Sequence, residues 1–173
     1  MQPTHSSNRI LLPVRNWFVF TTLMLALLLN LIPVGRFPGI PDWVAVVLTF
    51  WCIHQPLRVG MAAAFGLGLM MDIADGSLLG QHALAYVLLA FVAGGLSRRI
   101  LWFPLAQQAL HVLPMLLGSQ VVMLIVRLIG GGEFSGFMWF LSSVMAAVLW
   151  HPLTYLLLQP QSRPEERDEN RPT

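Results

Sequence analysis

The sequence has few charges, no lysine and a single cysteine. Only 10% of its 173 residues are charged, whereas 56% are hydrophobic, and the mean hydropathy is +0.68. A soluble domain carries about 25% charged residues, so the composition excludes an ordinary water-soluble protein. The lone Cys52 permits no internal disulfide and no cysteine-based zinc site. These shortages indicate an integral membrane protein.

Positive charge is carried by arginine alone. The formal net charge is +2, and most of the ten arginines lie at the edges of apolar segments or in the C-terminal tail. This placement is typical of membrane topology signals and not of a basic stripe that follows phosphates. We therefore expect membrane lipid as a partner, and no nucleic acid.

Apolar runs separated by proline, glycine and arginine predict six membrane spans. They are residues 17–35, 42–56, 59–73, 82–97, 105–128 and 136–158. A helix needs about 20 residues to cross the hydrocarbon core. The second and third runs are shorter, so they form either two thin spans, which we favour, or a re-entrant hairpin. The expected fold is all-α, with one bundle of about six transmembrane helices over 17–158.

The arginines also predict the topology. With the N-terminus inside, the cytoplasmic side holds Arg9, Arg15, Arg58, Arg98, Arg99, Arg163, Arg167 and Arg171, and the outer side only Arg36 and Arg127. This asymmetry follows the positive-inside rule and places both termini in the cytoplasm. Residues 1–16 would form a cytoplasmic segment, and the charged, proline-rich 159–173 a disordered cytoplasmic tail. Asp42, Asp72, Asp75 and Glu133 would lie on or near the outer face.

The segment from Gly60 to Tyr86 carries a pattern of small residues. Gly60, Ala64, Gly68 and Asp72 are four positions apart, so they fall on one face of a helix. A ridge of small residues lets a second backbone approach closely within lipid. That backbone belongs either to another helix of this chain, which we favour, or to a partner protein.

Two acids close this helix. Asp72 and Asp75 are three positions apart and share a face, and the turn formers Gly76, Ser77 and Gly80 follow. An acid near membrane depth is a candidate functional group, because an ionised carboxylate in hydrocarbon is costly. We predict that Asp72, the more buried acid, accepts hydrogen bonds from Ser77 or from backbone amides of the turn. Direct contact with a partner is the alternative.

Catalysis and metal binding are poorly supported at these acids. His82 is the nearby basic side chain in this outer loop, and no nucleophile and base accompany it. The spacing of Asp72, Asp75 and His82 matches no familiar metal site. We therefore expect no enzymatic activity, no cofactor and no metal.

The stretch "HQPLRVGMAAAFGLGLMMDIADGSLLGQHALAYVLLAF" (54–91) resembles the signature of the rod shape-determining protein MreD family. The matching positions are Pro56, Gly60, Phe65, Gly68, Asp72, Gly76, Ser77, Gly80, Ala83, Leu84 and Tyr86. The resemblance implies a non-enzymatic inner-membrane component of the bacterial cell-elongation machinery. It also implies association with MreC and, through it, with MreB, the elongation transpeptidase and RodA.

A second function stays open. The six-span plan is also similar to the substrate-binding subunits of vitamin-uptake transporters. A protein of that kind needs a cavity lined by polar groups and open to the outer side, beneath the loop 72–82.

Overall fold

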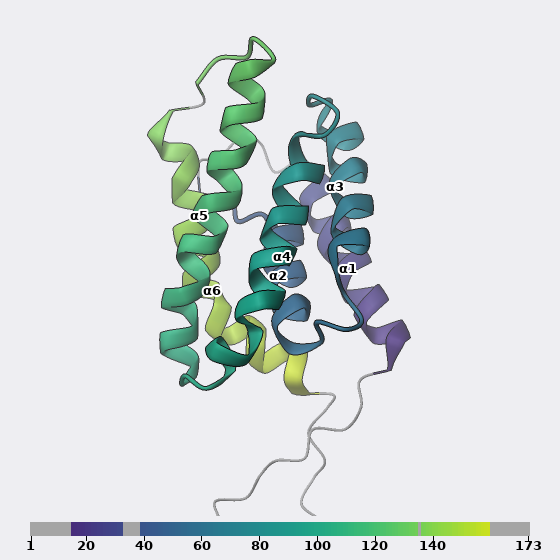
Figure 1. Ribbon diagram of the computed structural model, residues 1–173, viewed down its shortest axis with the longest axis vertical. Helices are drawn as coiled ribbons and strands as arrows, with labels where there is room; N and C mark the ends of the chain where they lie inside the picture. Colours follow the sequence, from purple (N-terminus) through teal and green to yellow (C-terminus); the bar gives the residue numbers. More distant parts are fainter. Residues whose placement is uncertain (1–14, 33–38, 135, 160–173) are drawn as a thin grey trace, which may run out of the picture.

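The computed structural model describes residues 15–32, 39–134 and 136–159, which form a bundle of helices (Figure 1). The elements are α1 (Asn16–Leu31), α2 (Trp43–His54), α3 (Met61–Asp75), α4 (Gln81–Leu101), α5 (Leu105–Ile129), the 3-10 helix η1 (Phe137–Phe140) and α6 (Leu141–Leu158). The described ranges contain no strand, so the predicted all-α fold is confirmed.

Among the described residues, three stretches are long and apolar enough to cross a membrane: α4, α5 and Phe137–Leu158. The 12 residues of α2 extend about 18 Å, at about 1.5 Å per residue. The hydrocarbon core measures about 30 Å, so α2 is too short to cross it at that thickness. The crossing of α1, α2 and α3 and the position of the termini remain predictions.

The short helix α2 occupies the centre of the bundle. Every residue from Val44 to Ile53 is buried, and α2 packs against α1, α4, α5 and α6. A helix that is apolar on all sides is expected in the interior. In Figure 1, α2 begins about halfway along the bundle and runs to the end where α1 starts and α6 stops.

That same end carries three of the arginines predicted to be cytoplasmic, whereas Arg9, Arg163, Arg167 and Arg171 lie outside the described residues. Arg58, in the connection from α2 to α3, donates a hydrogen bond to Asn16 Oδ1 at the start of α1, at 3.0 Å. Arg98 and Arg99 lie in the last turn of α4, which ends at the same side in Figure 1. The fold therefore groups these charges as the topology prediction requires.

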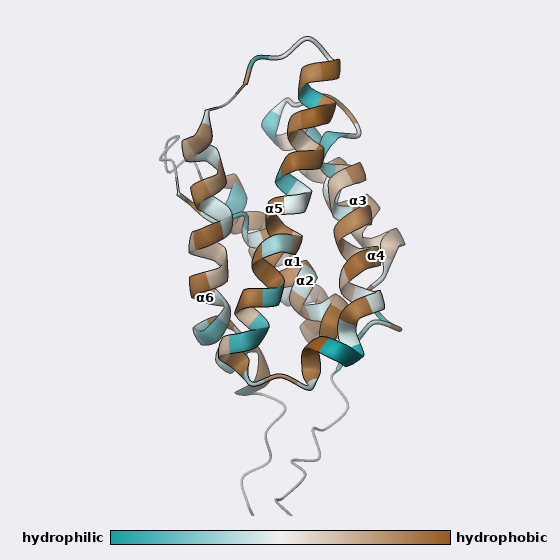
Figure 2. Ribbon diagram, turned by 60° about the vertical axis from the view of Figure 1, so that its left-hand side comes forward, coloured by the Kyte–Doolittle hydropathy of each residue, from teal (hydrophilic) through white to brown (hydrophobic). Residues whose placement is uncertain are grey.

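The outer surface of the bundle is apolar. Large hydrophobic side chains such as Phe20, Leu28, Phe91 and Val148 are exposed. Figure 2 shows brown, hydrophobic turns along the whole length of the bundle. A monomeric soluble protein rarely exposes such extensive apolar surface. The exposed faces are therefore suited to contact with lipid chains.

Some helix boundaries differ from the prediction. The first run was extended to residue 35, but α1 ends at Leu31, and 33–35 lie outside the described residues. α3 reaches Asp75 instead of residue 73, so both acids belong to its last turn. α4 continues to Leu101, beyond the predicted 97. The predicted disordered tail lies, apart from Gln159, outside the described residues.

Candidate functional site

Gly68 brings α3 into direct contact with the backbone of α4. A Cβ atom on Gly68 would lie 2.6 Å from the Ala83 nitrogen and 2.8 Å from the His82 carbonyl carbon. No side chain fits there unless one backbone moves, because the neighbouring atoms belong to the main chain. Ala64, one turn earlier, is also fully buried. At Gly68, then, the close approach is made within this chain.

Gly60 departs from the predicted ridge. It is the residue that precedes α3, and a Cβ atom placed on it would meet nothing within 4 Å. The periodicity of four holds only inside a helix, and the helix begins one residue after Gly60. The expectation that Gly60 takes part in close helix packing inside the bundle was therefore wrong.

The Asp72 side chain, only 1% exposed, is surrounded by donors. Its Oδ1 accepts hydrogen bonds from Ser77 Oγ at 2.9 Å, His82 N at 2.8 Å and His82 Nδ1 at 2.9 Å. Its Oδ2 accepts from Gly80 N at 2.8 Å and Ala83 N at 3.4 Å. Ser77 and the backbone amides that follow it are the donors expected from the sequence.

These bonds cap α4 from a neighbouring helix. The first amides of a helix have no partner within it and are usually capped by the residue just before it. Here that residue is Gly80, which has no side chain, and Asp72 of α3 takes its place. The negative carboxylate also suits the positive end of the α4 dipole. Gly76 and Gly80 adopt φ values of +60° and +101°, which favour glycine and allow the tight turn.

His82 connects the two acids of this corner. Its Nδ1 lies 2.9 Å from Asp72 Oδ1, and its Nε2 lies 3.7 Å from Asp75 Oδ2, whose side chain is 48% exposed. Asp72 is thus the more buried acid, as predicted.

Ser77 is not placed as a nucleophile. A catalytic histidine binds serine with one ring nitrogen and the acid with the other. Here the same Nδ1 of His82 faces both Ser77 Oγ, at 3.3 Å, and Asp72. The Ser77 hydroxyl also donates to the carboxylate, so the arrangement serves as a helix cap. Across the described ranges, no three His, Cys, Asp or Glu side chains are grouped to hold a metal.

Asp42 forms a second carboxylate centre, which the sequence analysis missed. Oδ1 accepts from Asn30 Nδ2 at 2.8 Å and from Ala45 N at 3.0 Å, and Oδ2 accepts from Tyr86 OH at 2.7 Å. Trp43 N donates to Asn30 Oδ1 at 2.9 Å. We call these residues the Asp42 junction, since they join α1, α2 and α4.

Asp42 lies close to the corner that Asp72 holds. Its partner Tyr86 lies one helical turn beyond His82 along α4 and is fully buried, and Asp42 lines a cavity together with Asp75 and His82. The place of Asp42 on or near the outer face of the membrane stays a prediction. An acid directly before an apolar run is a helix-start signal and would have identified its capping role. Tyr86 was one of the positions of the family signature, but no sequence signal paired it with Asp42.

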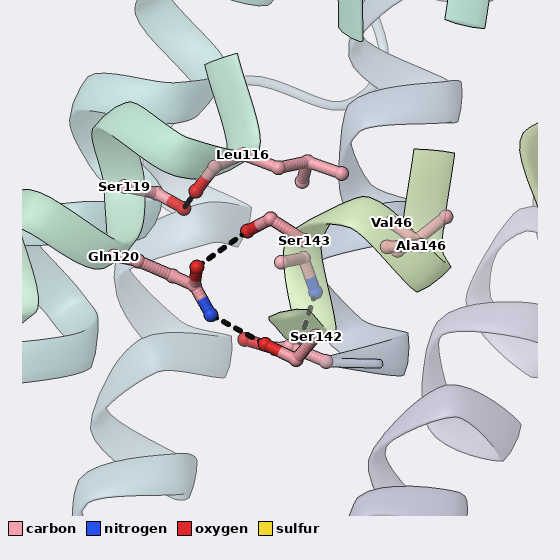
Figure 3. Close-up of a pocket in the computed structure, with 9 residues that line it drawn as sticks. Val46, Leu116, Ser119, Gln120, Ser142, Ser143 and Ala146 are labelled. Atoms are coloured by element: carbon pink, nitrogen blue, oxygen red, sulfur yellow. Dashed lines mark hydrogen bonds between the residues drawn. The ribbon is translucent and has the colours of Figure 1, made fainter. Parts of the chain in front are cut away.

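A polar seam joins α5 and α6 beside this junction. Gln120 of α5 donates to Ser142 Oγ, and Ser143 Oγ donates to Gln120 Oε1 at 2.6 Å. Figure 3 shows the Gln120 amide held between the two serines of α6. All three side chains are buried, so the seam satisfies its polar groups internally, as burial requires.

A cavity of about 550 Å³ lies over the start of α2. Its walls come from the end of α1, the segment before α2, and α3 to α6. The lining residues are Leu29, Asn30, Ile32, Gly39, Ile40, Pro41, Asp42, Trp43, Met71, Asp75, His82, Gln120, Met123, Trp139 and Ser142. Polar groups thus line a space in the half of the bundle that holds the α3–α4 turn.

Comparison with known proteins decides the family. The family model of the rod shape-determining protein MreD matches residues 8–160, most of the chain. This chain belongs to the MreD family. It is 28% identical over 153 residues to the Rod shape-determining protein MreD of Haemophilus influenzae (strain ATCC 51907 / DSM 11121 / KW20 / Rd), which covers 84% of this chain and 91% of that protein. No solved structure gives a significant match.

Eight of the eleven positions that suggested the MreD family fall into two structural groups. One group builds the α3–α4 contact and its turn, and consists of Gly68, Asp72, Gly76, Ser77, Gly80 and Ala83. Phe65 and Leu84 instead point away from the core, with exposed fractions of 51% and 47%. These two apolar side chains leave a surface on the α3–α4 pair that the described chain does not cover.

Proposed function

We propose that this MreD-family protein is a non-enzymatic scaffold in the bacterial inner membrane, which it crosses several times. It positions partner membrane proteins of the elongation machinery for lateral peptidoglycan synthesis and so regulates cell shape. The observation that carries the proposal is the family match over residues 8–160, together with a curated relative named for rod-shape determination.

The geometry of the acids supports a role without catalysis. The Asp72 carboxylate is committed to five donors of the α3–α4 corner. A group held in this way stabilises a shape and has little freedom to exchange protons with a substrate. The described loops between the helices are short, so the partner contacts would be made by the helix faces and their turns.

We propose MreC as the direct partner, with MreB, the elongation transpeptidase and RodA reached through it. The outward side of the α3–α4 pair, marked by Phe65 and Leu84, is the contact surface that we favour. Its geometry is fixed by Gly68 and Asp72 beneath it, so a partner helix would meet a preformed surface. Association in lipid depends on this kind of close packing, because the lipid chains themselves are apolar.

The uptake hypothesis is not favoured. A polar-lined cavity was its structural requirement, and the cavity over α2 has such a lining. The family and the curated relative are nevertheless named for cell shape, not for transport.

Depletion in a rod-shaped host tests the proposed function. Loss of the protein is expected to turn rods into round cells, and the wild-type chain should restore them. Uptake of small molecules should be unchanged. Normal rods after complete depletion would contradict the proposal.

Site-specific crosslinking tests the contact surface. Cys52 is the single cysteine, so a Cys52→Ser background allows Phe65→Cys and Leu84→Cys to be introduced singly. Crosslinks to MreC are expected from both positions. Val148→Cys on α6, which is also exposed, is the matched control and should give none. Crosslinking from Val148→Cys alone would move the interface away from α3–α4.

A further inference from the structure

The cavity over α2 has the size and the floor of a ligand site. Small-molecule sites usually measure about 300–1,000 Å³, and this cavity holds about 550 Å³. Asp42, Gln120 and Ser142 line it and also line a second space of about 10 Å³ beneath it. A space of about 10–15 Å³ admits one water molecule when polar partners surround it. The cavity therefore has a polar floor that is built from the Asp42 junction and the α5–α6 seam.

The charge of the lining is acidic. Asp42 and Asp75 both face the cavity and repel each other electrostatically. Of the described lining residues, none is arginine or lysine. Three hydrogen bonds occupy the Asp42 carboxylate, which has about four acceptor sites. Asp75 is half exposed, with His82 Nε2 at 3.7 Å. Both carboxylates line the cavity and keep acceptor capacity.

The walls complement this charge with aromatic and apolar surface. Trp43 and Trp139 line the cavity from α2 and η1, and Met71 and Met123 add thioethers from α3 and α5. An indole face attracts a cation, and the attraction is strongest when water is excluded. The cavity thus offers carboxylates to a positive group and apolar walls to the body that carries it.

We propose that this cavity binds a ligand with a primary ammonium group on an apolar body. The ammonium group is held by the carboxylates of Asp75 and Asp42, and the apolar body lies against the tryptophans. A primary ammonium fits better than a quaternary one, because its three N–H groups can donate to the free acceptor sites. The site is independent of the proposed scaffold function, and either can fail without the other.

Two probes distinguish the possible sources of the amine. Hexylammonium serves as the free amine in binding measurements on the full chain in detergent, with hexyltrimethylammonium and hexanol as controls. Phosphatidylethanolamine serves as the lipid source, measured by its retention over phosphatidylglycerol in native mass spectrometry. Saturable 1:1 binding of either amine, with about tenfold preference over its control, is the expected result, since a charge-assisted hydrogen bond contributes about 1.5–3 kcal/mol.

Asp75→Asn is the decisive variant, because Asp75 is half exposed and lies outside the Asp42 junction. It should weaken amine binding about tenfold. Glu133→Gln removes an acid from an exposed position that does not line the cavity, and should leave binding unchanged.

Two results would overturn the proposal. They are equal amine binding by the wild type and Asp75→Asn, and equal binding of hexylammonium and hexanol by the wild type.

Discussion

The two carboxylate centres of this protein, at Asp72 and at Asp42, are built in opposite ways. Asp72 takes its donors from residues 77–83, which follow it closely along the chain. Asp42 takes donors from Asn30 and Tyr86, which lie 12 and 44 positions away. The first centre closes a turn completely, whereas the second borders a cavity. The carboxylate of Asp72 is therefore fully hydrogen-bonded within the α3–α4 turn, whereas the carboxylate of Asp42 keeps an acceptor site beside the cavity.

The largest loss of stability is expected at Gly68, which brings α3 and α4 together beside the turn held by Asp72. Gly68→Ala would force a methyl group against the Ala83 backbone and should reduce the free energy of unfolding by about 3 kcal/mol or more. Thermal unfolding in detergent measures this loss. Gly66→Ala, on the same helix but with open space around its Cβ, is the control and should be neutral or slightly stabilising. Equal effects of the two substitutions would show that the helices are not in close contact.

The next largest loss of stability is expected at Asp72. Asp72→Asn would turn an amide donor toward backbone donors, so a loss of about 2–3 kcal/mol is expected. Ser77→Ala removes one donor and leaves the carboxylate other partners, so it should cost about 1 kcal/mol. Chemical unfolding of both variants checks this order. If Asp72→Asn abolished rod shape while expression and partner binding stayed normal, Asp72 would have a role beyond the turn.

A smaller effect is expected at the Asp42 junction. Tyr86→Phe removes the hydrogen bond to Asp42 Oδ2 and should lower stability by about 1.5 kcal/mol, because the acceptor is charged. A double-mutant cycle with Asp42→Asn isolates the pair. A coupling energy near zero would mean that the phenol and the carboxylate contribute independently, and that the junction does not act as a unit.

The smallest effect is expected in the α5–α6 seam. Ser143→Ala removes one hydrogen bond to Gln120, and such bonds between membrane helices average about 0.6 kcal/mol. Ser119→Ala is a matched control on α5, because the Ser119 hydroxyl bonds only within its own helix, to the Leu116 carbonyl. Comparison of the free energies of unfolding of the two single variants shows whether the hydrogen bond between helices adds more stability than one within a helix.

The sequence predicted the α3–α4 turn held by Asp72 far better than it predicted the Asp42 junction. Gly68, Asp72, Ser77 and Gly80 lie within one short segment, so their spacing was enough to predict a close-packed helix and a turn held by Asp72. The number of helices also followed from the apolar runs. The Asp42 junction and the α5–α6 seam join residues from different helices, and nothing in the sequence states which helices are neighbours.

The burial of α2 was only partly predictable. Its uniform apolar composition suggested a membrane span, but the same composition fits a helix surrounded by protein. Only the packing of α1, α4, α5 and α6 around it distinguishes the two. The cavity follows from this packing, because α2 begins deep in the bundle and leaves space above Asp42.

The cap that Asp72 provides to α4 has a consequence for biosynthesis. A nascent chain that ends before Gly80 contains the acid and Ser77 but none of the donors from Gly80 to Ala83 that satisfy the carboxylate in the folded protein. Such a carboxylate would oppose the entry of α3 into lipid. We therefore expect α3 and α4 to enter the membrane as one hairpin, with insertion of α3 rising sharply once truncated chains extend beyond Ala83. Insertion assays on chains of increasing length would show this step, and gradual insertion of α3 alone would argue against it.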